Sequence, residues 1–585
     1  MCQLGCTVGG GKGKAMKYIL SVLVVLLPVT LSAWADAELV VLNGDIHTVD
    51  PATPRAEALA VTQGRFVAVG SNEAISHYIG ASTRVIDAAG RTVTPGFIDG
   101  HSHVRGTSPA VYGVDLSYVV DKGEWLERIA EADQRMPAGE WITGGWWDHT
   151  LSDGQFPNRE MLDRVVSERP VLLNHIDGHY SWANTRALTM AGVNQDTPVP
   201  PGGKIMIDPN SGEPTGILLE GAQDLVRRVI PEVSEDRRRR GLADMQQYAN
   251  RLGITGLHQM GAREDYLFVV EHGDPTIRVW YGEFGPTGST ADDGREIDDI
   301  LNIRSASAAR VAATGKESRS GPLFSMGYVK LTSDGVLSAH TAVLEAPYHD
   351  REGWTGDYII APGDLAVRVK KLAAAGLPVA IHAIGDAAVH SALDAFESAL
   401  EHPVALPHRV EHMEIVLPGD IERFRALGVV ASMQPNHATN AIGYVPDRIG
   451  PVREAYAYVW RSLLDAGVPL VFGADYATSP LNPLVQMADA MFRQSPFGYH
   501  DGQSWHPEQA VTFAEALHAY TQAGANVTSW RDAIGSITVG KWADFVLLDG
   551  TVPEPMSAAF RDLSVSATFF AGREVYAQNP AQASP

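Results

Sequence analysis

The chain has 585 residues, of which 45% are hydrophobic and 20% charged, a composition that is ordinary for a soluble globular protein. Its length exceeds what one small core needs, so we expect more than one structural unit. A formal net charge of −23 argues against nucleic acid as a partner, because phosphates bind positively charged surfaces. The one dense basic tract, residues 237–240, follows two acidic residues and is typical of a solvated helix face.

The N-terminus has the pattern of a secretory signal peptide. Lysines precede an apolar run over residues 18–27, and two alanines spaced as A-x-A end the segment. We expect residues 1–35 to be removed, leaving an exported protein, periplasmic or secreted, without a membrane span. Retention as an anchor is the alternative, but the run is short for a bilayer and is broken by Pro28. Met16 is a second candidate for the true start of the chain.

Cysteine occurs only at Cys2 and Cys6, both inside the predicted signal peptide. The mature chain would therefore have no disulfide and no cysteine ligand. Any metal ion must be held by histidine, aspartate, glutamate or a modified lysine.

Short strands are predicted at both ends of the chain, between polar turns. They cover residues 38–49, 57–61, 65–69 and 83–87, and then 535–537, 545–548 and 566–576. The simplest arrangement is one small β-sandwich domain made of residues 36–91 and 535–585. Two unrelated hairpin units are the alternative, and each would have little core.

The central part of the chain, residues 92–534, alternates strands with amphipathic helical stretches, which predicts an α/β fold built as a TIM (β/α)₈ barrel. A segment of about residues 106–233 is too long for a loop and predicts an inserted subdomain with a tryptophan-rich core, to which a strand at 171–175 would belong. The eight predicted barrel strands are 92–101, 253–260, 277–284, 326–332, 377–383, 408–413, 429–434 and 469–475.

Ligand-type residues gather at the ends of these strands. His101 and His103 end the first strand and, two residues apart in an extended chain, point to the same side. Each of the others has an ordinary structural explanation when taken singly, such as a helix cap, but all would meet at the end of a barrel where catalysis takes place. Neutral imidazoles with a carboxylate suit a divalent ion, zinc first. The remaining members are Lys330, His382, His412 and Asp475, on strands 4, 5, 6 and 8.

At these residues the chain resembles the amidohydrolase superfamily, most closely the branch called amidohydrolase family 3, or YtcJ-like. The resemblance covers nearly everything from Leu39 to Val575, and it implies a distorted (β/α)₈ barrel with a small β-sandwich formed by both termini. The matching stretches are PGFIDGHSH, NHIDGHYSWANTRAL, GITGLHQMG, VKLTSDG, IHAIGDAAV, HRVEHME and FGADYATSPLNP.

The resemblance also implies roles. His101, His103 and Asp475 would bind one ion, His382 and His412 a second, and Lys330 would bridge them as its N-carboxylate. Carboxylation is needed because a free lysine, with a pKa of about 10.4, is a cation. A single-metal centre is the alternative. Asp475 would act as the catalytic residue, taking a proton from metal-activated water and returning it to the leaving amine.

Further polar and aromatic residues are candidates for binding the substrate. Two of them, in the GHYSWAN region, could close the pocket from the insertion, and one tryptophan is the candidate for its wall. The candidates are Trp147, Asp177, His179, His258, Asp334, His340 and His437.

These features predict a metal-dependent hydrolase that cleaves the C–N bond of a small amide, formamide, N-acyl amine or cyclic amide. The resemblance points to N-substituted formamides and N-acyl compounds. Two alternatives stay open: an esterase or lactonase with the same centre, and a non-catalytic exported binding or regulatory protein. Paired acidic residues of a glycosidase are not evident, and a homo-oligomer is compatible with the sequence.

Overall fold

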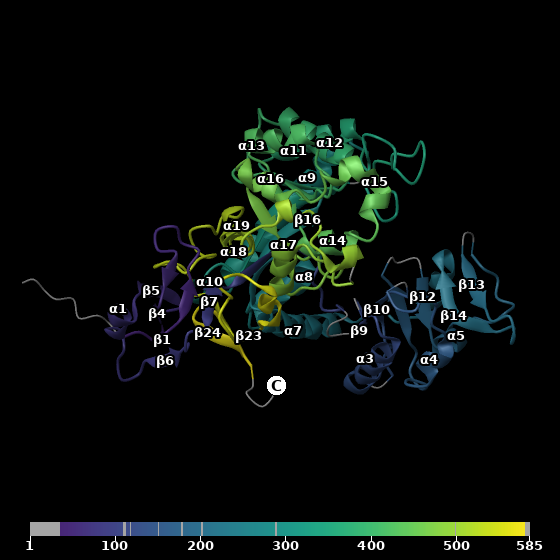
Figure 1. The fold of residues 1–585 in the computed structure, drawn as a ribbon, viewed down its shortest axis with the longest axis horizontal. Coiled ribbons are helices and arrows are strands. Elements are labelled where there is room, and N and C mark those ends of the chain that lie inside the picture. Colours follow the sequence, from purple (N-terminus) through teal and green to yellow (C-terminus); the bar gives the residue numbers. More distant parts are fainter. Residues whose placement is uncertain are drawn as a thin grey trace, which may run out of the picture. The chain divides into compact units, whose positions relative to one another are not determined.

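The computed structural model describes residues 36–578 except 109–112, 118, 138, 150, 177–179, 201–202, 287–288 and 498. The predicted signal peptide and its cleavage site precede these residues and lie outside the description. Four sheets and their connecting helices make up the described chain (Figure 1). None of the described helices combines the length and the apolar character that a bilayer span requires.

The central sheet is an eight-stranded parallel barrel in which each strand pairs with the next along the chain. Helices alternate with the strands, so the predicted distorted TIM barrel is confirmed. Most strand residues are buried on both faces, as expected of parallel strands covered by helices. The strands are β8 (Phe97–Ser102), β15 (Ile254–Met260), β16 (Arg278–Phe284), β17 (Phe324–Thr332), β18 (Val379–Ala383), β19 (Arg409–His412), β20 (Val430–Met433) and β21 (Leu470–Phe472).

The barrel helices begin and end at recognisable signals. One starts at Pro418 and stops at Gly428, whose left-handed backbone (φ 65°) suits glycine. Another starts with a capping box between Thr512 and Glu515. From α7 onwards, the helices between and after the barrel strands are α7 (Glu235–Arg251), α8 (Arg263–His272), α9 (Asp293–Ala313), α10 (Glu317–Ser320), α11 (Pro362–Ala374), α12 (Asp386–Ser398), α13 (Pro418–Leu427), α14 (Pro435–Ala441), α15 (Val445–Glu454), α16 (Trp460–Asp465), α17 (Pro483–Phe492), α18 (Phe513–Ala519) and α19 (Gln522–Asn526).

The first and last barrel strands meet differently from the others. Among the described residues they share a single bridge, between Ser102 and Tyr476, instead of a continuous ladder. Gly100 and Gly473 lie at this junction, where an added Cβ on Gly473 would collide with the backbone nitrogen of His101. Glycine therefore permits the two backbones to approach, and the amide of Asp475 donates to the carbonyl of His101 at 2.8 Å.

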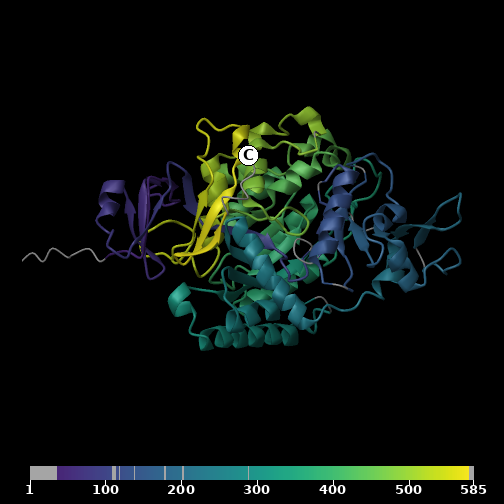
Figure 2. The same ribbon diagram turned by 90° about the horizontal axis from the view of Figure 1, so that it is seen from below.

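Of the two further sheets, the six-stranded one combines strands from the N-terminal and C-terminal segments, and the four-stranded one contains N-terminal strands alone. The purple N-terminal and yellow C-terminal strands lie side by side in both views (Figures 1 and 2). The predicted first barrel strand is divided: its residues 92–95 pair in the six-stranded sheet, and only β8 belongs to the barrel. The four-stranded sheet is β5 (Arg65–Gly70), β4 (Ala58–Thr62), β1 (Leu39–Leu42) and β6 (Arg84–Asp87); the six-stranded sheet is β24 (Arg573–Ala577), β23 (Val565–Phe570), β22 (Phe545–Leu548), β7 (Thr92–Pro95), β2 (Asp45–His47) and β3 (Arg55–Ala56).

The fourth sheet lies between β8 and α7 in the sequence, within the predicted insertion. Its core contains Trp125, Trp147 and Trp182, all fully buried. The strand predicted at 171–175 belongs to this sheet and not to the barrel. The elements are β9 (Val114–Asp115), β10 (Gly144–Trp147), β11 (Leu172–His175), β12 (Tyr180–Ala183), β14 (Pro214–Leu219) and β13 (Lys204–Ile207), with α3 (Lys122–Arg135), α4 (Arg159–Asp163), α5 (Thr185–Ala191) and α6 (Asp224–Arg227).

One histidine of the barrel links stability to pH. His408 accepts a hydrogen bond from the amide of Val379 at its Nδ1 and stacks on Phe396. Burial lowers the pKa of His408 to about 4, whereas an unfolded histidine has a pKa of about 6.5. Below pH 6.5 the unfolded chain binds a proton that the folded chain does not, so this stability is present above pH 6.5 and is lost towards pH 4.

The wild type should therefore lose more unfolding free energy than His408→Gln when the pH falls from 7 to 4.5. We expect the difference between the two losses to be on the order of 2 kcal/mol, since one pKa unit is worth about 1.4 kcal/mol. Chemical denaturation of the wild type and the variant at both pH values measures this difference. The matched variant His77→Gln, at an exposed position, should leave the pH dependence unchanged. An equal pH dependence in His408→Gln would contradict the assignment.

Candidate metal centre

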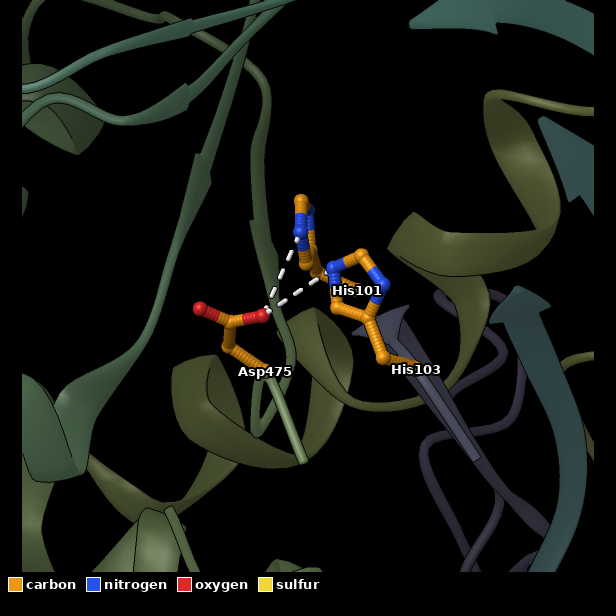
Figure 3. Close-up of side chains that lie close together, drawn as sticks. All are labelled: His101, His103 and Asp475. Atoms are coloured by element: carbon orange, nitrogen blue, oxygen red, sulfur yellow. Dashed lines mark ion pairs between the residues drawn. The ribbon is translucent and has the colours of Figure 1, made fainter. Parts of the chain in front are cut away.

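The end of β8 brings two imidazoles to one carboxylate. His101 is fully buried, His103 is partly exposed, and Asp475 follows β21 at the barrel junction. The Oδ1 atom of Asp475 lies 3.5 Å from Nε2 of His101 and 3.4 Å from Nε2 of His103 (Figure 3). Three potential ligand atoms thus face one another as a group that could hold a metal ion.

The second oxygen of Asp475 faces a different pair of histidines. Its Oδ2 atom lies 3.9 Å from Nδ1 of His412 and 3.9 Å from Nε2 of His437. These three residues form a second group of potential ligands that shares Asp475 with the first. One carboxylate therefore stands between two histidine pairs.

Lys330 and His382 complete the set predicted from the strand ends. The Nζ atom of Lys330 lies 3.3 Å from Nε2 of His101, and the rings of His382 and His412 are 4.6 Å apart between centroids. His382 places Nε2 3.1 Å from the carbonyl of Gly335, so a proton on Nε2 leaves the lone pair on Nδ1. The structure brings all six predicted ligand residues together.

Burial sets the protonation of these groups. Desolvation lowers the pKa of His101 and His412 well below the usual value and that of His382 to about 4. It also lowers the pKa of Lys330 to about 8. The imidazoles are therefore neutral at pH 7, the state that a metal ligand requires, and with the carboxylate of Asp475 they form a donor set that fits a divalent cation.

Glu411 and Arg409 orient the centre, and sequence reasoning missed both. Glu411 is fully buried on β19, and its Oε2 lies 2.6 Å from Nδ1 of His101. Arg409 donates to both carboxylate oxygens of Glu411. An N–H at Nδ1 of His101 turns the lone pair of Nε2 towards Asp475. The alternation of basic and acidic residues in HRVEHME was the available signal for these two residues. It does not show that Glu411 contacts His101, because that depends on which face of the strand points into the barrel.

Glu411→Gln should weaken metal binding and activity by about 10- to 100-fold, because carboxylates that orient metal-bound histidines typically contribute that much. Competition with a chelator measures the metal affinity, and kcat/KM measures the activity. Glu422→Gln, at a largely exposed position on α13, is the matched control. Wild-type metal affinity in a correctly folded Glu411→Gln would show that the contact does not orient the ligand.

A cavity of about 660 Å³ adjoins the centre. His382, His412, His437 and Asp475 form its polar side, and residues of the inserted segment also line it. Its apolar lining includes Leu151, Ile176, Val336, Leu337, Ile384 and Phe497. The space suits a small molecule with one polar, reactive group and one apolar substituent.

The predicted substrate-binding residues divide into three sets. His437 lines the cavity as expected. Asp177 and His179 lie outside the described residues. The prediction that Trp147 forms the pocket wall was wrong: its ring is fully buried among Trp125 and Trp182, and its Nε1 donates to the carbonyl of Leu173.

The other three predicted substrate contacts serve the framework and do not line this cavity. His258 receives a hydrogen bond from Arg409 at 2.8 Å, inside the barrel. Asp334 accepts the amides of Val343, Ile384 and Gly385, and burial raises its pKa to about 7. His340 faces Asp350 in the loop after β17.

Comparison with known proteins agrees with this geometry. A sequence model of the amidohydrolase family matches residues 84–576. The chain belongs to the amidohydrolase family. With the donor set described above, membership of the amidohydrolase family identifies a metal-dependent hydrolase.

Relatives of this amidohydrolase span nearly its whole length. Protein LONG AFTER FAR-RED 3 of Arabidopsis thaliana is 32% identical, over 92% of each chain. N-substituted formamide deformylase of Arthrobacter pascens is 28% identical, over 92% of this chain and 97% of its own. An uncharacterised metal-dependent hydrolase from Pyrococcus furiosus superposes with a TM-score of 0.64 at 25% identity, over 87% of this chain and 98% of its own.

Proposed function

We propose that the protein hydrolyses the C–N bond of a small N-substituted formamide, N-acyl amine or cyclic amide. The observation that carries the proposal is the position of Asp475, whose two oxygens face two histidine pairs at 3.4–3.9 Å. Such a carboxylate can serve as a ligand and as a proton carrier in one place. The relative named N-substituted formamide deformylase supports the substrate class.

The proposed ligand assignment is the one that the family resemblance implies. His101, His103 and Asp475 would hold one ion, zinc first, and His382 and His412 would hold a second if two are bound. His437 lies close enough to Asp475 to contact either the ion or the substrate.

Lys330 would join the two positions after carboxylation. Its neutral amine adds to carbon dioxide and releases a proton, which gives an N-carboxylate with anionic oxygen donors. Burial favours this step because it lowers the pKa of Lys330 to about 8 and so raises the fraction of neutral amine. Without carboxylation the lysine offers no anionic ligand, and a single ion would be expected.

When bound, the cation supplies Lewis acidity, which acidifies water and polarises a carbonyl. The chain's own contribution is proton transfer by Asp475, which takes a proton from the attacking water and delivers it to the leaving nitrogen. Delivery matters for an amide, because an amine leaves poorly unless its nitrogen is protonated. The apolar wall of the cavity would hold the substituent on nitrogen and limit access of bulk water.

A substrate panel tests the proposal. Zinc-loaded protein is offered N-formyl, N-acetyl and cyclic amides in parallel with esters and lactones, and chelator-treated protein is the control. We expect turnover of amides that zinc restores after chelation. Turnover of esters or lactones alone would replace the C–N assignment with an esterase. If the protein binds no metal under metal-replete conditions, the proposed hydrolysis fails at its first step.

A further inference from the structure

A second cluster of metal-ligand side chains lies in the inserted sheet. Strands β10 and β11 are parallel neighbours, and Trp147 pairs with His175 after a register shift between Gly145 and Trp147. Asp148 and His149 directly follow β10, and His175 ends β11, so the carboxyl ends of both strands deliver these side chains to one edge. None of the three belongs to the centre around Asp475.

The donor atoms of this cluster are as close as ligands of one ion. Nδ1 of His149 lies 3.1 Å from Nε2 of His175, and Oδ1 of Asp148 lies 3.6 Å from the same Nε2. One donor atom from each residue lies within 4.8 Å of the others. Two ligands of a tetrahedral zinc ion, each about 2.0–2.1 Å from it, are separated by roughly 3.3 Å, so these spacings need little adjustment.

Aromatic packing fixes the two rings in this arrangement. The ring of Phe156 stacks on that of His149, with 4.1 Å between the ring centroids. The ring of Trp147 meets that of His175 edge-on, with 4.6 Å between the centroids. Tyr180 flanks His175 at 5.2 Å, and His175 is buried. Ligands held by packing lose little conformational freedom when an ion binds. Such a site therefore binds an ion more tightly than a cluster of mobile surface side chains does.

We propose that Asp148, His149 and His175 form a separate site for a divalent transition-metal ion such as Zn²⁺. Two imidazoles and a carboxylate are the ligands that such ions prefer, and three protein ligands leave a fourth position open. Asp148 and His175 also line the 660 Å³ cavity, so that position faces the space where a substrate would bind. The site stands independently of the reaction proposed above.

Equilibrium dialysis against zinc, followed by metal analysis of the full chain, tests the site. His149→Gln and Asp148→Asn should each bind one equivalent of zinc per chain less than the wild type. His272→Gln, at an exposed position on α8, is the matched control and should bind the wild-type amount. Visible absorption of bound Co²⁺ gives a second readout, in which both site variants lose the same part of the spectrum.

Variants of the two sites should act independently. His103→Ala alters the centre around Asp475, and the double variant His103→Ala/His149→Gln should show the sum of the two single losses. Circular dichroism checks that each variant is folded. If His149→Gln proves to be misfolded, Asp148→Asn, a nearly isosteric change, decides the test in its place. Unchanged zinc binding and Co²⁺ absorption in the folded variants would overturn the proposal and leave a hydrogen-bonded histidine pair.

Discussion

Asp475→Asn is expected to lower kcat by about 10²- to 10⁴-fold, the usual contribution of a positioned proton carrier. Asparagine matches the aspartate in shape and tolerates the left-handed backbone of this position (φ 54°), so the fold should persist. Its amide cannot accept a proton from water, and it is a weaker ligand. Steady-state kinetics with the best substrate of the panel, together with metal analysis, separates loss of the proton carrier from loss of the ion.

Asp465→Asn, on the exposed surface of α16, repeats the same chemical change away from the centre and should keep wild-type kinetics. If Asp475→Asn retains its metal but loses kcat, proton transfer is the main role. If kcat stays within a few-fold of the wild type, Asp475 is not the proton carrier and the mechanism must be rebuilt around another group.

Asp544→Ala is expected to reduce the free energy of unfolding by about 3–5 kcal/mol, because it leaves a buried charge without its partner. Arg278, the first residue of β16, is fully buried and donates to both oxygens of Asp544 at 2.6 and 2.8 Å. Asp544 precedes β22 of the six-stranded sheet and also accepts the amide of Ala571. The pair therefore connects the barrel to the sheet made by both ends of the chain.

Chemical denaturation measures this loss, and an exposed pair supplies the comparison. Asp274 accepts from Arg573 on the surface, with side chains that are 71% and 51% exposed. Asp274→Ala should cost less than about 1 kcal/mol, because solvent screens such a pair. Equal effects of the two substitutions would mean that the pair of Arg278 and Asp544 contributes no more to the free energy of unfolding than an exposed pair does.

The barrel and its ligand residues could be predicted because strand ends are local features. An apolar run that stops at His382 or Asp475 can be read directly from the chain, and parallel strands deliver such residues to one end of a barrel. The sequence does not show, however, which strands a given segment pairs with. Residues 92–95 look like the start of β8, yet they pair with strands 45–47 and 545–548.

The same limit explains the errors around the site. Glu411 and Arg409 were missed because their partners, His101 and Gly100, are about 310 residues away in the sequence. Trp147 was misplaced because a tryptophan in a strand packs equally well against a core or a ligand, and only the neighbouring Trp125 and Trp182 decide between them.

The glycine pair at the junction of β8 and β21 has a consequence for how this centre can change. Gly100 and Gly473 let two backbones approach where side chains would normally keep them apart. His101 directly follows Gly100, and Asp475 lies two residues after Gly473. A single methyl group on either glycine would force the two strands apart and so separate His101 from Asp475, although no ligand residue would have been replaced. Catalysis here is thus vulnerable at two positions that carry no functional group at all.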